Sequence, residues 1–133
     1  MLGEKIGEET GQTIGRRVLP GDGMPSMEVS FQAQGKVLGM ESSDVGTYVA
    51  TMGPDGLLRG TGQGILMTKD GEGASWKGHG VGKMTKNGGV SWRGSLVYMT
   101  MSPKLARLNS IVGLFEYEVD ATGKTLGKIW EWK

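Results

Sequence analysis

Apolar and polar residues alternate along most of the chain, and short runs of turn-forming residues interrupt the alternation. Period two is the repeat of a β-strand, whose successive side chains point to opposite faces. Four interruptions have the Asp-Gly, Asn-Gly or Pro-Asp composition of tight turns, namely GPDG at 53–56, DGEG at 70–73, KNGG at 86–89 and DATG at 120–123. The pattern predicts eight strands in antiparallel hairpins, at 4–18, 25–39, 41–52, 57–69, 74–86, 90–101, 110–119 and 124–132.

Glycine makes up 25 of the 133 residues, and two runs place it at every second position: Gly60, Gly62 and Gly64, then Gly78, Gly80 and Gly82. Neither run has the spacing of a nucleotide-binding loop. Glycines inside strands cost roughly 0.5–1 kcal/mol each, which a flat sheet has no reason to carry. Strands that bend and close around an interior do need them. We predict an all-β fold, an eight-stranded antiparallel, mostly up-and-down β-barrel in one domain (1–133), with a calycin-like barrel and a β-sandwich as alternatives.

The segment SPKLARLN (102–109) predicts one short helical turn before the last hairpin. Ser102 suits the N-cap, Pro103 suits the first helical position, and Asn109 can end the turn. Leu105 and Leu108 would share one face. The segment is either a lid over one end of the barrel or a surface loop.

The turns also predict which residues pair across neighbouring strands. Pairing Ile65 with Gly78, and Tyr48 with Thr61, places each glycine of the two runs opposite a larger side chain. The face expected inside carries Tyr48, Gln63, Ile65, Met67, Trp76, Met84, Arg93, Ser95, Val97 and Met99. The opposite face carries Val45, Val49, Leu66, Lys77, His79, Val81, Lys83, Trp92, Leu96 and Tyr98. Its two lysines argue against an interior position, although a one-residue bulge would exchange the faces of any strand.

Five residues of the expected inner face are candidate ligand-binding residues: Tyr48, Gln63, Trp76, Arg93 and Met99. A mostly apolar cavity with a few convergent polar groups is the usual composition of a small-molecule pocket. For Arg93 the alternative is an ion pair with Asp44 or a glutamate, which would stabilise the sheet.

In the last hairpin, the face expected in the core carries Ile111, Phe115, Tyr117, Val119, Leu126, Lys128, Trp130 and Trp132. The other face carries Glu116, Glu118 and Glu131. These glutamates form either a solvated face or a set of paired catalytic carboxylates.

Charge and composition narrow the function classes. Fifteen basic and fourteen acidic residues leave a net charge of +1 without a charge block, so we expect neither a nucleic-acid nor a membrane partner. Cysteine is absent, and the single histidine, His79, lies in no metal-binding motif, so no metal or other cofactor is expected; His79 is either a general base or an ordinary polar side chain. No apolar run reads as a signal peptide or a membrane span, which favours a cytoplasmic protein.

Two stretches carry a resemblance to a known superfamily: GTYVATMGPDGLLRGTGQG (46–64) and VSWRGSLVYMTMSPKLARLNSIVGLFEYEVDATGKTLGKIWEWK (90–133). From about residue 25 onward the chain resembles uncharacterised microbial proteins similar to the allene oxide cyclase barrel-like superfamily. The resemblance implies a barrel with a cavity for an apolar small molecule. In allene oxide cyclase a glutamate and a bound water aid ring closure, but no glutamate of this chain matches that one, so no catalytic residue is carried over.

These features predict a β-barrel protein that binds a small apolar ligand. The first alternative is a cofactor-independent cyclase or isomerase of the allene oxide cyclase type. It would require Glu116, Glu131, Asp44 or His79 to line the cavity beside Tyr48 or Arg93. The second alternative is a structural module that forms a homo-oligomer through Trp130 and Trp132.

Overall fold

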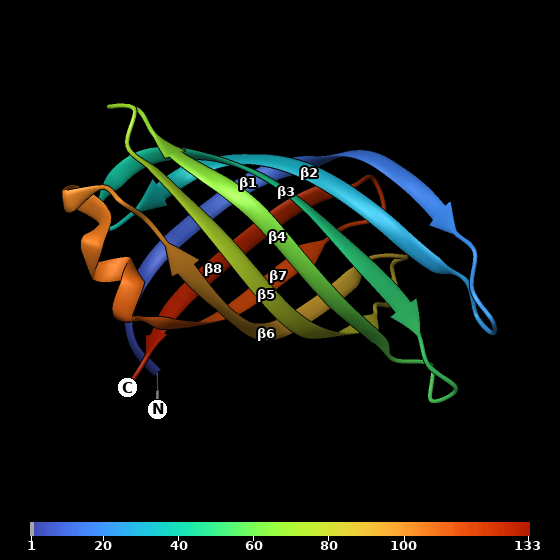
Figure 1. Cartoon of the computed structure of the whole chain (residues 1–133). Helices are drawn as coiled ribbons and strands as arrows, with labels where there is room; N and C mark the ends of the chain where they lie inside the picture. Colours follow the sequence, from blue (N-terminus) through green and yellow to red (C-terminus); the bar gives the residue numbers. More distant parts are fainter. Residues whose placement is uncertain (1) are drawn as a thin grey trace.

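The computed structural model describes residues 2–133, whose strands form one closed barrel (Figure 1). The strands are β1 (Leu2–Leu19), β2 (Ser26–Val37), β3 (Met40–Met52), β4 (Leu58–Thr68), β5 (Gly73–Met84), β6 (Val90–Met99), β7 (Val112–Val119) and β8 (Lys124–Trp132). Each strand pairs antiparallel with the next, and β1 pairs with β8 to close the barrel. The predicted eight-stranded up-and-down barrel is confirmed, and most strand ends lie within two residues of the predicted ones.

Four hairpin turns share one geometry, and this geometry decides which side chains enter the barrel. Each loop ends on a glycine with a left-handed backbone: Gly56, Gly71, Gly88 and Gly123 have φ angles of 80°, 87°, 86° and 88°. Around Gly71, the Thr68 N–H donates to the Glu72 carbonyl at 2.8 Å, and the Gly71 N–H donates to the Thr68 carbonyl at 3.0 Å. This is the three-residue hairpin loop in which a left-handed residue follows a type I turn.

The three-residue loops shift the strand pairing from the predicted register by an odd number of residues. Tyr48 lies opposite Gly62 rather than Thr61, a shift of one, and Ile65 lies opposite Ser75 rather than Gly78, a shift of three. Because side chains alternate along a strand, an odd shift exchanges its two faces. The predicted inner and outer faces are exchanged at every such turn. Two successive exchanges restore the correct faces, so the prediction is right on every second strand. Of the residues expected inside, Tyr48 of β3 and Trp76 of β5 do point inward, whereas Met84 at the end of β5 is 54% exposed and those on β4 and β6 point outward.

The same error affects the last hairpin. Phe115 and Tyr117 of β7 face the interior, as predicted. Trp130 of β8 does not, because it lies opposite Leu114 on the outer face, and Trp132 is 56% exposed. The prediction of an aromatic core face is therefore right for β7 and wrong for β8.

Both glycine runs lie on the inner face of the barrel and pair largely with each other. Gly60 lies opposite Gly80, and Gly62 lies opposite Gly78. The prediction that each of these glycines faces a larger side chain is therefore wrong for these four, whereas Gly64 does lie opposite Trp76 and Gly82 opposite Leu58. A Cβ on Gly64 would lie 2.4 Å from the Trp76 ring, and one on Gly60 would lie 2.9 Å from the Trp92 ring. The missing side chains thus leave space for two inward-pointing indoles.

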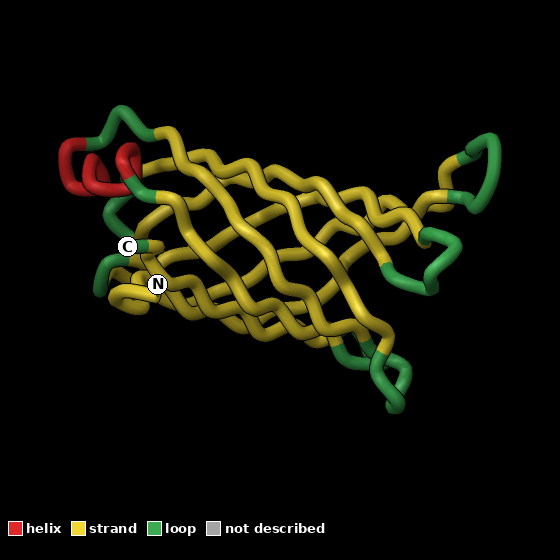
Figure 2. Tube along the Cα trace, turned by 90° about the horizontal axis from the view of Figure 1, so that it is seen from below, coloured by secondary structure: helices red, strands yellow, loops and turns green. Residues whose placement is uncertain are grey.

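A 3-10 helix, η1 (Pro103–Ser110), covers the end of the barrel where both termini lie (Figures 1 and 2). Leu105 and Leu108 on its inner face are fully buried. They pack against Ile6, Val37 and Leu96 of the barrel wall. The predicted helical turn is confirmed, and it is a lid rather than a surface loop.

Polar contacts hold the lid in place. Ser102 is the N-cap residue, as predicted, but its side chain makes no capping hydrogen bond; its hydroxyl donates to the Glu72 carboxylate instead. The Asn109 side chain accepts from the Thr100 N–H at 2.9 Å and donates to the Thr100 carbonyl at 3.1 Å. These contacts join η1 to β6 and to the turn between β4 and β5.

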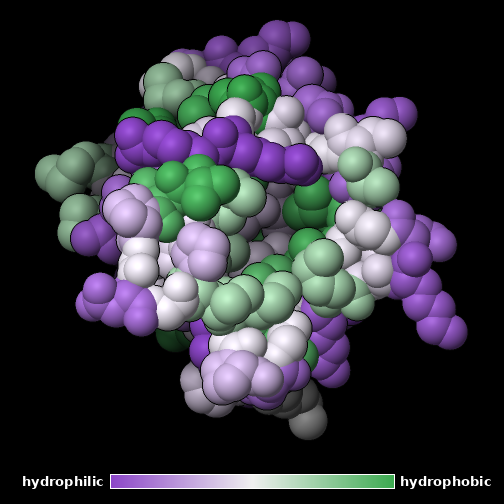
Figure 3. Space-filling model, turned by 90° about the vertical axis from the view of Figure 1, so that its right-hand side faces the viewer, coloured by the Kyte–Doolittle hydropathy of each residue, from purple (hydrophilic) through white to green (hydrophobic). Residues whose placement is uncertain are grey.

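The opposite end of the barrel is less covered. β8 follows β1 only as far as Gln12, so the rest of β1 pairs with β2 alone and the β1–β2 hairpin projects beyond the wall (Figure 1). Figure 3 views this end, where hydrophobic residues surround a central hollow. Residues 2–133 include no helix with the length and apolar character needed to span a membrane.

Candidate functional site

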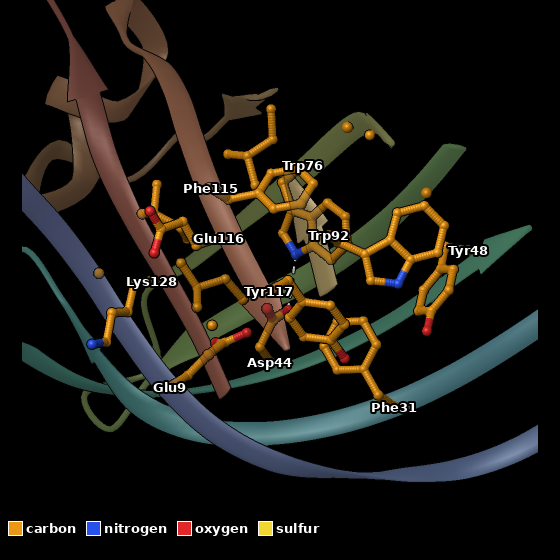
Figure 4. Close-up of a pocket in the computed structure, with 18 of the residues that line it drawn as sticks. Glu9, Phe31, Asp44, Tyr48, Trp76, Trp92, Phe115, Glu116, Tyr117 and Lys128 are labelled. Carbon is orange, nitrogen blue, oxygen red and sulfur yellow. Dashed lines mark hydrogen bonds between the residues drawn. The ribbon is translucent and has the colours of Figure 1, made fainter. Parts of the chain in front are cut away.

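The barrel interior contains a cavity between two packed clusters of side chains. One cluster lies under η1, and the other surrounds Trp92 and Val119 toward the open end. The cavity measures about 100 Å³, counted as the space open to the centre of a water molecule. Its wall is mostly apolar and includes seven aromatic residues, Phe31, Tyr48, Trp76, Trp92, Tyr98, Phe115 and Tyr117, most of them shown in Figure 4. The space has room for several water molecules, each needing about 10–15 Å³ on this measure, or for one small organic molecule.

Two of the five predicted ligand-binding residues lie on the cavity. Tyr48 of β3 and Trp76 of β5 belong to its wall. Gln63 of β4 and Arg93 of β6 are on the outer face and exposed, and Met99 is 71% exposed. The odd-numbered register shift at the turns explains these three differences. Arg93 pairs with Glu118 at 2.8 Å on the outer surface, which agrees with the alternative that it stabilises the sheet.

Two carboxyl groups meet inside the barrel, one from Glu9 of β1 and one from Asp44 of β3 (Figure 4). The strand between them, β2, places Gly35 opposite Glu9 and Ala33 opposite Asp44. These two small residues leave the inner surface of β2 low enough for the carboxyl groups to reach one another. Asp44 also accepts a hydrogen bond from Trp76 Nε1 at 2.9 Å.

The environment of this pair favours the protonated form. Burial is the largest effect and, together with the charge of Asp44 and the hydrogen bond to it, raises the pKa of Glu9 to about 9. Burial also raises the pKa of Asp44, against hydrogen bonds from Glu9, Trp76 and the Val45 backbone that favour its carboxylate. At neutral pH the Glu9 carboxyl therefore keeps its proton and donates it in a hydrogen bond to Asp44.

Two hydrogen-bond donors on the cavity wall, Trp92 Nε1 and the Tyr117 hydroxyl, are buried and make no full hydrogen bond among residues 2–133. Each has a polar neighbour with which it makes only a weak contact, the Tyr48 hydroxyl for Trp92 and Thr125 for Tyr117. Burial raises the pKa of Tyr117, and it raises that of Tyr48 to about 12, so both phenols stay protonated near neutral pH. Because buried polar groups in folded proteins are nearly always paired, both donors have capacity left for an acceptor inside the cavity.

The other titratable residues considered from the sequence take no part in this pair. His79 is exposed on the outer face of β5. Glu116 lies opposite Lys128 on the outer face, and Glu131 pairs with Arg107 at 2.9 Å beside the lid. Across residues 2–133, no three His, Asp or Glu side chains are grouped as a metal site would require.

Sequence reasoning overlooked Glu9, and it assigned Trp92 and Tyr98 to the outer face. The β1 register is irregular between Leu2 and Gly7, so alternation does not tell which of the adjacent Glu8 and Glu9 points inward. Trp92 and Tyr98 lie on β6, where the turn error reverses the faces. The sequence signal was the glycine at the end of each turn, which indicates a left-handed residue and so a three-residue loop. Using this loop length would have placed Trp92 and Tyr98 of β6 on the inner face.

No protein-family model and no curated protein sequence matches the chain. Solved structures do resemble it. One is a protein of unknown function from Clostridium acetobutylicum, with a TM-score of 0.82, 12% identity and coverage of 96% of each chain. Another is a conserved protein of unknown function from Rhodopseudomonas palustris, with a TM-score of 0.83, 11% identity, and coverage of 98% of this chain and 97% of that one. A beta-barrel like protein from Acinetobacter baumannii also matches, with a TM-score of 0.81, 13% identity, and coverage of 100% of this chain and 96% of that one. These likenesses support the barrel fold alone. None of the three is described as an allene oxide cyclase, so that resemblance stays a prediction.

Proposed function

We propose that the protein binds a small, largely apolar molecule inside the barrel. The observation that carries the proposal is the aromatic cavity with two unpaired donors on its wall, Trp92 Nε1 and the Tyr117 hydroxyl. Aromatic rings offer apolar contact area, and a few donors orient a ligand that has an acceptor atom. The volume of the cavity limits the ligand to about the size of one or two fused rings. We also propose that the protein is located in the cytoplasm.

Crystals soaked in indole test this proposal, because indole is small, aromatic and neutral. The expected result is indole density between Trp76, Trp92 and Tyr117. Native mass spectrometry of the protein purified from its host would add the mass of a co-purified organic molecule. The proposal would be wrong if, in the soaked crystals, side chains fill the barrel interior and indole is found only on the outer surface.

A second candidate is acid–base catalysis on the bound molecule, as in a cofactor-independent isomerase. It is favoured by the Glu9–Asp44 pair, in which one carboxyl donates a proton while the other accepts one. On a β,γ-unsaturated ketone, Asp44 would take a proton from the carbon beside the carbonyl while Glu9 transfers its proton to the carbonyl oxygen. The C–H electrons become a C=C bond of the dienol, and the C=O π electrons bind the proton from Glu9. Return of the proton on Asp44 to the γ-carbon, and of the oxygen's proton to Glu9, gives the conjugated isomer.

Exchange of cyclohexanone α-protons in D₂O, followed by NMR, tests this candidate. Catalysis predicts exchange faster than in buffer, and predicts that the Asp44→Asn protein loses the acceleration. Equal rates with the wild-type protein, the variant and buffer alone would remove the candidate. Self-association through Trp132, which is 56% exposed, is a separate question that light scattering answers.

A further inference from the structure

The charge inside the barrel is negative and has no basic partner nearby. Asp44 is buried and Glu9 is mostly buried, and no Lys or Arg among residues 2–133 shifts the pKa of either one. Lys128, on the nearby wall, occupies an outward position and pairs with Glu8 at 3.8 Å, with its ammonium group directed away from the cavity in Figure 4. A buried carboxylate without a counter-charge is costly, and a cationic ligand would supply that charge.

The other charged and titratable groups around the pair do not neutralise it. Tyr98 and Tyr117 face the pair, and burial, followed by the negative charges near them, raises the pKa of each phenol. Lys36 lies on the outward side of β2 and is exposed. Arg16 acts on Tyr48, on the open side of the cavity. The deep part of the cavity is therefore acidic, while its positive groups are on the outer wall or toward the mouth.

Aromatic rings surround the space beside the pair. The ring centroids of Phe31 and Trp76 are 6.2 Å apart, those of Phe31 and Tyr117 are 5.5 Å apart, and those of Phe31 and Tyr48 are 6.4 Å apart. Most of these ring pairs are tilted, so the rings form a cage rather than a stack. The negative face of an aromatic ring attracts ammonium groups, most strongly where water is excluded.

The unpaired donors point to a ligand independently of the acids. Trp92 is 4% exposed and lines the cavity, and its Nε1 makes no full hydrogen bond within residues 2–133, only a weak contact with Tyr48. A ligand that places a cationic end against the carboxyl pair would present its other end to Trp92 and Tyr117. That end should therefore carry an acceptor oxygen.

We propose that the ligand is a small organic ammonium compound, bound with its cationic group against Glu9 and Asp44 within the aromatic cage and with an oxygen toward Trp92. The inference rests on the proposed function of the cavity and specifies the class of ligand. Binding of the cation releases the proton that the carboxyl pair holds, and this proton passes to solvent. Affinity for a permanently charged ammonium ion therefore rises with pH.

The test compares two probes of the same shape, choline and 3,3-dimethylbutan-1-ol, in which a neutral carbon replaces the ammonium nitrogen. Calorimetric titrations at pH 6, 7.5 and 9 give both affinities, and buffers of different ionisation enthalpy give the number of protons released. We expect choline to bind at least about tenfold more tightly than the alcohol at pH 9, and expect its affinity alone to rise with pH. Asp44→Asn and Glu9→Gln, which keep side-chain shape, should each remove most of this preference for choline over the alcohol.

The outcomes separate the two proposals. If the alcohol binds as tightly as choline, or if choline affinity does not change with pH, the cationic ligand class is wrong while the binding function stands. If neither probe binds and indole does not bind either, both proposals fail. Thermal unfolding of each variant checks that a lost affinity does not reflect a lost fold.

Discussion

Glu9 of β1 and Asp44 of β3 share a hydrogen bond across the strand that separates them. The contact depends on small residues beneath it, since Gly35 lies opposite Glu9 and Ala33 lies opposite Asp44. A Cβ on Gly35 would lie 1.9 Å from the Glu8 carbonyl oxygen, so that position does not accept a side chain without movement of the backbone. The small residues of β2 therefore allow both the close approach of β1 to β2 and the contact between the two carboxyl groups.

The carboxyl pair makes stability depend on pH. The pKa of Glu9 rises from 4.5 to about 9 on folding, so between these pH values the folded protein holds a proton that the unfolded chain has released. The free energy of unfolding should therefore fall as pH rises from 5 to 9, by at most about 1.4 kcal/mol per pH unit. Urea denaturation of the wild-type protein and of Glu9→Gln at pH 5, 7 and 9 measures the effect. The variant should show a flatter profile, and equal slopes in both proteins would show that Glu9 is not the group responsible.

Gly71, in the turn between β4 and β5, is required for its backbone conformation rather than for space. No atom lies within 4 Å of a Cβ added at Gly71, yet its φ of 87° is unfavourable for any L-residue with a side chain. Gly71→Ala should lower the free energy of unfolding by about 1 kcal/mol. Gly15→Ala is the matched control, because that position is equally open and its φ is not left-handed. Chemical denaturation of both variants gives the comparison, and equal stabilities would contradict the conformational explanation.

A glycine in the middle of β6 is required for the opposite reason. A Cβ on Gly94 would lie 2.0 Å from the His79 carbonyl oxygen and 2.7 Å from the Gly80 Cα, both backbone atoms. Gly94→Ala should therefore destabilise the barrel by about 3 kcal/mol, the upper part of the range for overpacking. Gly127→Ala, whose Cβ would make ordinary contacts of 3.4 Å or more, should cost far less. A melting temperature for Gly94→Ala at or above that of Gly127→Ala would show that the strands do not approach so closely.

The lid contributes to stability through two leucines. Leu105 and Leu108 are fully buried, and truncating a buried leucine to alanine typically costs 2–5 kcal/mol, so we expect about 3 kcal/mol for Leu105→Ala. Lys104→Ala in the same helix is the control, because its ion pair with Asp70 at 3.6 Å is exposed and such pairs contribute about 0–1 kcal/mol. Equilibrium unfolding of the two variants should separate them clearly. If both unfold like the wild-type protein, η1 does not form part of the core.

The fold could be predicted from the sequence because strands and turns are encoded locally. Alternation gives the strands, and the Asp-Gly and Asn-Gly pairs give the turns between them. The interior depends instead on the exact number of residues in each turn, and one residue more or less reverses a face. Tyr48 and Trp76 were placed correctly because they lie on β3 and β5, where two reversals cancel. Gln63 was placed on the wrong face, because it lies on β4, where only one reversal applies.

The carboxyl pair lay beyond prediction for a different reason. Glu9 and Asp44 are brought together by closure of the barrel and by the small residues of β2, neither of which appears in the sequence around either acid. Irregular pairing near the start of β1 also hides which glutamate of the Glu8–Glu9 doublet points inward. Local patterns give the wall of the barrel, whereas the chemistry inside it depends on contacts between strands far apart in the sequence.

Calorimetric titration of indole into matched glycine variants tests most directly whether the cavity binds a small molecule. A Cβ on Gly127 would lie 3.4 Å from the Tyr117 ring and 3.6 Å from Glu9, so Gly127→Val fills the cavity beside the carboxyl pair, whereas Gly15→Val adds the same atoms in open space. We predict saturable binding at one site in the wild-type protein and in Gly15→Val, and an affinity at least about tenfold lower in Gly127→Val. Equal affinities in all three folded proteins, or no saturable binding in any of them, would contradict a ligand site inside the barrel.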